Sequence, residues 1–123
     1  MDDLKLTVPI LFTRHKQILD EVVQRVMDIR SAQKHLDEVY GDRDRVRGVA
    51  KTLAWLVSEV GELAEAIVQN LGDERLREEA ADVAAWLLSL CNVAAIDLEE
   101  AFLRKYGAGC PRCGSKPCVC PLA

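Results

Sequence analysis

Four carboxylates with a repeated spacing are the residues of this chain best suited to do chemistry. Glu59 and Glu62 are three residues apart, and so are Glu79 and Asp82. Residues three apart lie on one face of a helix, so each pair presents two acids in one direction. If the two helices face each other, the carboxylates repel one another unless a cation lies between them, and an all-oxygen set suits Mg²⁺ or Mn²⁺. The spacing alone leaves open that these acids only solvate helix surfaces.

The segment around Asp82 is unusually apolar. From Ala80 to Ile96 it reads AADVAAWLLSLCNVAAI, and Asp82 is its only charged residue. The segment is shorter than the roughly 20 residues that cross a bilayer, so we expect a buried helix of a soluble protein, covered on every side. An aspartate in such a helix is costly unless a cation or a metal compensates it. Asp82 is therefore the first candidate for a site.

The elements that would position these acids are predicted to be helical throughout. Gly and Pro are sparse, apolar residues recur at helical spacing and no useful stretch alternates as a strand would. We expect an antiparallel bundle of four to five helices, with one or two over 12–40 and the others over 49–70, 73–95 and 98–106. Gly41 is expected to end the first region, a charged connection to cover 42–48, and Gly107 to end the last helix. Asp73 and Asp97 are the expected N-caps.

In the helix over 49–70, one apolar stripe is expected to face the core, and the acids lie beside it. The stripe consists of Leu53, Leu56, Val57, Val60, Leu63, Ala64 and Ile67.

Charge and length exclude some classes of protein. The net charge of -4 argues against a protein that grips a nucleic-acid polymer. The first ten residues, MDDLKLTVPI, lack the basic start and long apolar run of a signal peptide, so we expect a cytoplasmic protein without membrane segments. A chain of 123 residues buries a modest core, and self-association as a homodimer or homotetramer is expected.

The C-terminal segment differs in composition and carries a second candidate site. Cys110, Cys113, Cys118 and Cys120 follow the pattern C-x2-C-x4-C-x-C. Four thiolates satisfy tetrahedral zinc and leave no position for water, so a zinc ion here would be structural. Disulfides or free thiols are the alternatives. We divide the chain into an N-terminal helical extension (1–29), a helical domain that carries the paired acids (30–107) and a Cys-rich tail that is the candidate zinc-binding unit (108–123).

Two stretches resemble a known family. SEVGELAEAI from Ser58 and EEAADVAAWLLSLCNVAAIDLEEAFLRKYG from Glu78 are similar to MazG-type nucleotide pyrophosphohydrolases, and the similarity spans 39–107. The family's pattern is Glu-Glu-x-x-Glu followed by Glu-x-x-Asp, and here it reads S-E-V-G-E and then E-A-A-D. Ser58 replaces the first glutamate, as in members that resemble the dCTP pyrophosphatases.

The resemblance implies an activity and assigns residues to it. Members hydrolyse a nucleoside triphosphate (NTP or dNTP) to the monophosphate and pyrophosphate, typically to clean the nucleotide pool, and they assemble as dimers or tetramers. It implies that Mg²⁺ (or Mn²⁺) is held by four catalytic carboxylates, and it leaves four weaker candidates for substrate contacts. The carboxylates are Glu59, Glu62, Glu79 and Asp82; the substrate candidates are Lys51, Trp55, Trp86 and Lys105, with Arg104 as an alternative to the last.

Two alternatives to this function remain at the level of the sequence. One is a non-catalytic helical interaction module in which the acids only solvate and the zinc-binding tail docks a partner. The other is a relative of the phosphoribosyl-ATP pyrophosphohydrolases, which shares the chemistry but not the substrate. Ser58 and the N-terminal extension favour the first alternative.

Overall fold

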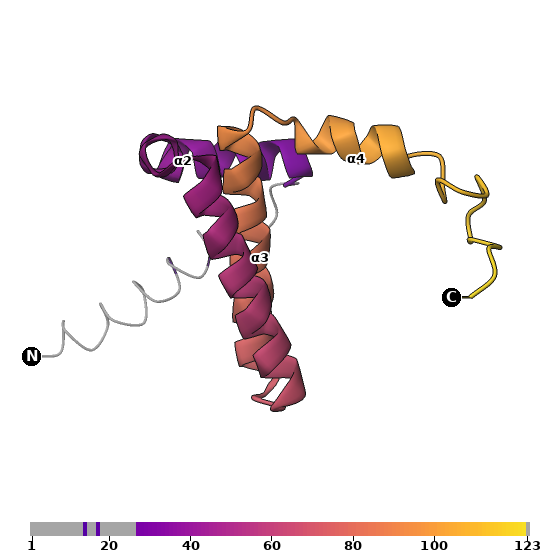
Figure 1. Ribbon diagram of the computed structural model, residues 1–123, viewed down its shortest axis with the longest axis horizontal. Coiled ribbons are helices and arrows are strands. Elements are labelled where there is room, and N and C mark those ends of the chain that lie inside the picture. The colour runs from indigo at the N-terminus through magenta and orange to yellow at the C-terminus, as the bar shows by residue number, and fades with distance from the viewer. Residues whose placement is uncertain (1–13, 15–16, 18–26, 123) are drawn as a thin grey trace, which may run out of the picture.

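The computed structural model describes residues 14, 17 and 27–122, and the regular structure in these residues is helical (Figure 1). It consists of α2 (Ile29–Val68), α3 (Asp73–Val93) and α4 (Leu98–Tyr106). The predicted all-helical class is confirmed, whereas the predicted count of four to five helices is not, since the described part holds three. The extension predicted over 1–29 lies almost wholly outside the described residues. Within them, no single helix is long and apolar enough to cross a membrane.

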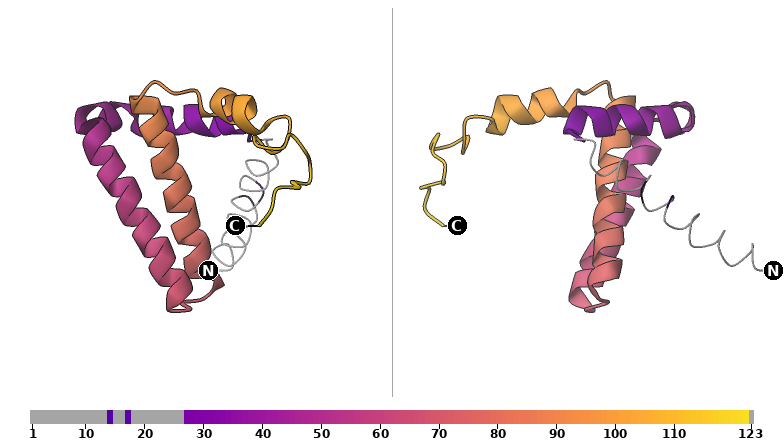
Figure 2. Two further views of the ribbon diagram at one scale, coloured as in Figure 1. Left: turned by 45° about the vertical axis from the view of Figure 1, so that its right-hand side comes forward. Right: turned by 180° about the vertical axis from the view of Figure 1, so that it is seen from behind.

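α2 bends sharply at Gly48. Its backbone there has φ +82° and ψ 170°, a combination that side-chain-bearing residues rarely adopt. Fully buried Thr52 donates its hydroxyl to the Gly48 carbonyl oxygen at 2.7 Å, which satisfies an acceptor next to the bend. The segment before the bend therefore crosses one end of the molecule, and the segment after it runs beside α3 (Figures 1 and 2).

The predicted helix end at Gly41 and the connection over 42–48 are wrong, because α2 continues through both. Gly41 is a buried residue inside the helix, and a Cβ there would overlap the side chains of Asp37 and Arg45. Arg45 donates to Asp37 Oδ1 at 2.7 Å across this position. The glycine thus provides close packing, and the charges of the supposed connection form ion pairs along the helix.

A short connection makes α3 the antiparallel neighbour of α2 (Figure 2). Asn70 and Gly72 adopt positive φ values of 52° and 100° and reverse the chain. The predicted N-cap at Asp73 is wrong by one position: Gly72 is the N-cap and makes no side-chain hydrogen bond, while Asp73 is the first helical residue. Asp73 and Glu74 still place negative charge in the first turn, where the helix dipole favours it.

The face of α2 that contacts α3 differs from the predicted core stripe. Buried Thr52, half-buried Glu59 and buried Ala66 follow one another at intervals of seven residues and lie on the contact face. In contrast, Leu53 and Val57 of the predicted stripe are 47% and 62% exposed. The expectation that the segment 80–96 is covered on every side also fails within one chain, because much of its side between 80 and 87 is exposed.

α4 is anchored to the start of α2 rather than to the α2 and α3 pair. Asp97 is its N-cap, as predicted, and accepts from the Glu100 amide at 3.1 Å. Arg30 pairs with Asp97 Oδ2 at 3.1 Å, and Gln33 donates to the Ile96 carbonyl oxygen at 2.7 Å. α4 ends at the C-cap Gly107, also as predicted, and it leads the chain away from α3 (Figure 1).

Candidate functional site

The carboxylates of α2 and α3 meet where the two helices pack. Glu59, Glu79 and Asp82 each offer an oxygen, and these oxygens lie within 4.8 Å of one another. Glu62 is exposed and outside this close trio, but its carboxyl contacts those of Glu59 and Glu79. We call the four residues the acid cluster. The predicted pairs on facing helices therefore converge.

Burial within the acid cluster falls on a different residue from the one predicted. Glu79 is 3% exposed, whereas Asp82 is exposed. The composition around Asp82 suggested burial, but Asp82 lies at the edge of the interface with α2 and Glu79 lies inside it. Arg75 Nε, one turn earlier on α3, donates to Glu79 Oε1 at 2.8 Å, which is the ion pair that the buried carboxylate makes within the described residues.

Two members of the acid cluster, Glu59 and Glu79, hold their protons more strongly than ordinary carboxylates do. Burial raises the pKa of Glu59, and the neighbouring carboxylates of Glu62, Asp82 and Glu79 raise it further. Burial also raises the pKa of Glu79; the Arg75 cation opposes this rise, and Glu62 and Asp82 reinforce it. The site therefore has an excess of negative charge that protons or a cation would relieve.

The donor set of the acid cluster fits a hard divalent cation. Glu59 Oε2 and Glu79 Oε2 are buried side-chain oxygens without a hydrogen-bond partner in the described part of the chain. Oxygens on opposite sides of an octahedral Mg²⁺ ion are about 4.2 Å apart, and the oxygens offered by Glu59, Glu79 and Asp82 lie within 4.8 Å of one another. A divalent cation could be coordinated by these unpartnered buried oxygens from two helices together with the exposed carboxylate of Asp82. Such an ion would supply the partner that the buried oxygens lack.

A hollow of about 220 Å³ opens next to the acid cluster, between α3 and the segment of α2 before the bend. Asp82 belongs to both the cluster and the lining of the hollow. Asp44 is 2% exposed; its Oδ1 accepts from Arg47 at 2.7 Å and its Oδ2 has no partner within residues 27–122. The lining consists of Tyr40, Arg43, Asp44, Arg47, Asp82, Ala85, Trp86 and Ser89.

The two tryptophans lie together at this place. Trp55 from α2 and Trp86 from α3 stack with their ring centroids 5.7 Å apart and their planes at 14°. The Arg47 guanidinium lies 4.7 Å from the centroid of the Trp86 ring, a cation–π contact. Trp86 thus forms an aromatic wall of the hollow, and Trp55, which is 51% exposed, supports it.

Sequence reasoning missed Asp44 and Arg47. Their spacing of three on α2 was a usable signal, because an acid and a base three apart can pair on one helix face. The sequence places both residues in a charged connection, since Gly41 is typical of a helix end. Their role depends on the bend at Gly48, which turns this segment of α2 across α3.

The structure does not bring the predicted lysines to the acid cluster. Lys51 is exposed and does not line the hollow. Lys105 is on α4, with its Nζ 5.5 Å from the centroid of the Tyr106 ring, and Arg104 pairs with Glu100 at 3.6 Å. Because α4 is anchored at the start of α2 and points away from α3, neither residue reaches the cluster within one chain.

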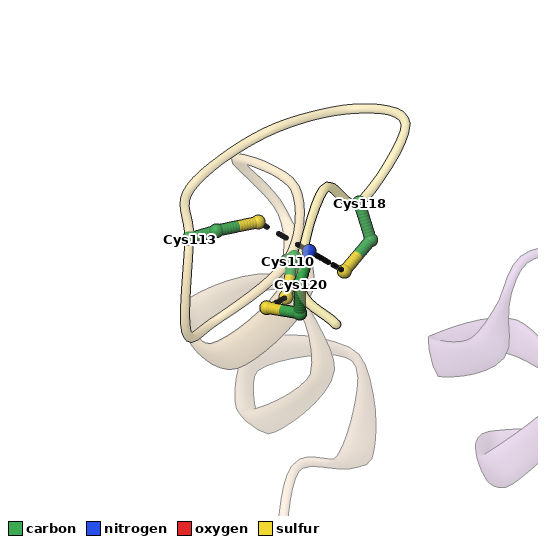
Figure 3. Close-up of side chains that lie close together, drawn as sticks. All are labelled: Cys110, Cys113, Cys118 and Cys120. Atoms are coloured by element: carbon green, nitrogen blue, oxygen red, sulfur yellow. Dashed lines mark hydrogen bonds between the residues drawn. The ribbon is translucent and has the colours of Figure 1, made fainter. Parts of the chain in front are cut away.

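The four tail cysteines form a second cluster, separate from the acids (Figure 3). All are free thiols. Hydrogen bonds from the backbone amides of Val119 and Ser115 lower the pKa of the Cys113 thiol to about 6. Backbone hydrogen bonds from Cys113 and Arg112 also lower the pKa of the Cys110 thiol. The loop therefore favours the thiolate, the form of cysteine that binds metals, at Cys113 and Cys110, whereas the neighbouring Cys118 and Cys113 side chains raise the pKa of Cys120.

Comparison with known proteins agrees with the geometry. The family model for the MazG nucleotide pyrophosphohydrolase domain matches residues 47–114, which are 68 of the 123 residues. The match includes the whole acid cluster, the bend of α2 and the first two tail cysteines. None of the curated proteins matches the sequence.

Proposed function

Because the chain belongs to the MazG nucleotide pyrophosphohydrolase family, we propose that it hydrolyses NTPs or dNTPs to the nucleoside monophosphate and pyrophosphate in a Mg²⁺-dependent reaction. The observation that carries this proposal is the convergence of the Glu59, Glu79 and Asp82 carboxylates. Two of their oxygens, one from Glu59 and one from Glu79, are buried and have no hydrogen-bond partner within the described residues. Cleaning of the nucleotide pool in the cytoplasm is the corresponding cellular role.

In this proposal Glu59, Glu79 and Asp82 of the acid cluster would hold Mg²⁺, or Mn²⁺ in its place, with Glu62 beside them. The ion would neutralise charge on the triphosphate and lower the pKa of the attacking water. Glu59, Glu79 and Asp82 are the close ligands. The packing of α3 on α2 holds Glu59 and Glu79 in place before the substrate arrives, which limits the reorganisation that binding requires.

Glu62 is the carboxylate that we assign to the attacking water. It is exposed and lies outside the close trio, so an oxygen remains available to orient the water and accept its proton. The water oxygen forms a bond to the α-phosphorus as the bond to the oxygen that bridges the α- and β-phosphorus atoms breaks. Pyrophosphate leaves with that bridging oxygen, and the monophosphate gains the oxygen of the water.

The hollow beside Asp82 is the proposed site of the base. Its volume of about 220 Å³ is below the roughly 300 Å³ at which drug-sized pockets begin, so it suits a base better than a whole nucleotide. Trp86 offers an aromatic wall on which the base would stack in place of the Arg47 guanidinium, and Asp44 Oδ2 is an acceptor for an N–H group of the base. The triphosphate would then extend from the hollow to the acid cluster.

A panel of NTPs and dNTPs with Mg²⁺ tests this function when pyrophosphate and phosphate are detected separately. We expect the unmodified protein to release pyrophosphate and Asp82→Asn to lower kcat/KM by about 10²-fold or more, because one ligand and the charge near the substrate are lost. Glu78→Gln is the matched control on α3: Glu78 is exposed and outside the cluster, so its activity should stay unchanged.

Turnover retained in a folded Asp82→Asn protein would contradict the assigned site. Absence of pyrophosphate across the panel, together with no stabilisation by Mg²⁺ and nucleotide in thermal unfolding, would instead favour the interaction module. The Asp82→Asn variant should fold, since Asp82 is exposed in a single chain and the change preserves its shape.

A further inference from the structure

The tail cysteines lie at the corners of a small volume within one chain. Each Sγ is within 4.8 Å of the other three, and the pairs Cys110 with Cys120 and Cys113 with Cys118 are both 3.9 Å apart. Figure 3 shows the four sulfurs contributed by two arms of a single loop. All four ligands of a tetrahedral site are therefore already together without a second subunit.

These separations are those of ligands around one ion rather than of bonded sulfurs. A disulfide bond is about 2.05 Å long. A zinc ion bound by four thiolates at about 2.3 Å places the sulfurs about 3.8 Å from one another, since that is the edge of the corresponding tetrahedron. The two shortest contacts of the cluster match this edge length.

The backbone of the loop is built to hold this arrangement. The Gly114 amide donates to the Cys110 carbonyl oxygen at 2.7 Å and the Cys110 amide donates to the Ser115 carbonyl oxygen at 3.1 Å, which closes a tight turn around the first two cysteines. Gly114 has φ +72°, which favours glycine. On the second arm, the Cys120 amide donates to Cys118 Sγ at 3.4 Å.

We propose that Cys110, Cys113, Cys118 and Cys120 of one chain bind a single zinc ion as a closed structural centre. Four thiolates around Zn²⁺ carry two net negative charges, and the cations of Arg112 and Lys116 lie in the same loop to offset them. Because all four positions are filled by sulfur, the ion has no place for a water and takes no part in hydrolysis.

The tail needs such an ion because it has almost no apolar core of its own. Val119 is 72% exposed and Leu122 is fully exposed, and no helix or strand extends beyond Tyr106 in the described tail. A short loop of this kind loses conformational entropy on folding without compensating burial, so metal binding supplies its folding free energy.

Zinc analysis of the full-length chain tests the proposal. We expect one zinc per chain by elemental analysis after gel filtration, and at least a 10-fold loss of bound zinc in Cys113→Ser. Cys113→His should keep its zinc, because three thiolates and one imidazole also form a stable structural site. Loss with serine but retention with histidine separates metal binding from a purely conformational role of the side chain.

Cys91→Ala is the matched control, because Cys91 is a free thiol on α3 and outside the tail cluster. It should keep one zinc per chain. Replacement of zinc by Co²⁺ should produce the visible absorption of tetrahedral thiolate coordination in this control and in the unmodified protein, but not in Cys113→Ser.

Four other results would overturn the proposal. Half a zinc per chain would show that the ion is shared between subunits. A metal-free protein with one titratable thiol after unfolding would show two disulfides, and a metal-free protein with five thiols would show an empty cluster. Iron in place of zinc after expression with both metals would reject the assigned ion.

Discussion

Among single residues, Glu79 combines the costs and the uses of a buried carboxylate. One of its oxygens pairs with Arg75 on the same helix, and the other has no partner in the described residues. Its pKa is raised above the usual 4.5, with burial as the largest cause. Glu79 is therefore a proposed metal ligand whose charged, carboxylate form is disfavoured by burial when no cation is bound.

Glu79→Gln should consequently change how stability depends on pH. Because the pKa of Glu79 is raised on folding, the folded chain binds a proton that the unfolded chain releases, and the associated stability is lost as the pH rises from about 4.5 through the raised pKa. The glutamine variant lacks this loss. Without added Mg²⁺, urea unfolding should therefore show its stability relative to the unmodified protein increasing from about pH 4.5 towards neutral.

Glu78→Gln is the control for this experiment, since Glu78 is exposed one position earlier on α3. Its stability difference should be nearly flat over the same pH range. A difference for Glu79→Gln that falls instead of rising towards neutral pH would mean that the pair with Arg75 outweighs burial. With Mg²⁺ and nucleotide, the unmodified protein should instead be more stable than Glu79→Gln near neutral pH, because the ligands stabilise the carboxylate form of Glu79.

The sequence predicted which acids converge but not which acid is buried. Spacing on two antiparallel neighbours is sufficient to bring Glu59, Glu79 and Asp82 together. Burial depends on the rotation of α3 about its own axis, which no local pattern determines. The apolar residues around Asp82 suggested that Asp82 is buried, but the exposure of a residue depends on which side of the helix it occupies and not on the composition of its neighbours.

At the scale of elements, the bend of α2 creates the hollow. Before Gly48 the helix supplies Asp44 and Arg47, and after it the helix supplies Trp55 and Glu59 to the other side of the same site. A straight α2 would carry the first pair away from α3. The conformation of one glycine therefore joins the proposed base site to the acid cluster.

Two glycines of α2 should respond oppositely to alanine. Gly48→Ala forces a side chain into φ +82° although the space around a Cβ is open, and we expect it to destabilise the protein by about 1–3 kcal/mol. Gly61 is helical with equally open space, so Gly61→Ala should stabilise by about 0.5–1 kcal/mol. Denaturant unfolding measures the change in the free energy of unfolding of both variants. Changes of the same sign in the two variants would contradict the role assigned to the bend.

Local sequence signals predicted some elements well and others poorly. Asp97 as an N-cap and Gly107 as a helix end were correct because both act within a few residues of their own position. Gly41 was misassigned because its contact partners, Asp37 and Arg45, lie a turn away on each side. A glycine that ends a helix and a glycine that permits close packing look the same in a sequence.

At the scale of the whole molecule, a single chain leaves an apolar stripe of α2 uncovered. Val49, Leu53, Val57, Val60 and Ile67 are between 46% and 62% exposed and lie on one side of the helix, next to the face that contacts α3. Ala66 and Cys91 are the buried apolar residues of the described chain. The predicted core stripe is thus exposed within one chain, because its periodicity indicates an apolar face but not which element packs against it.

We therefore expect this stripe to pack against a second copy, in keeping with the predicted homodimer or homotetramer. Val57→Glu places a charge in the middle of the stripe, and we expect it to weaken self-association by at least about 10-fold, since both apolar burial and charge desolvation oppose assembly. Sedimentation at several concentrations measures this. Ser58→Glu, at an exposed position of α2 that faces away from the stripe, should keep the mass of the unmodified protein. An unmodified protein that sediments as a single chain would refute the assembly. An unchanged mass for Val57→Glu would instead show that the subunits associate through a surface other than this stripe.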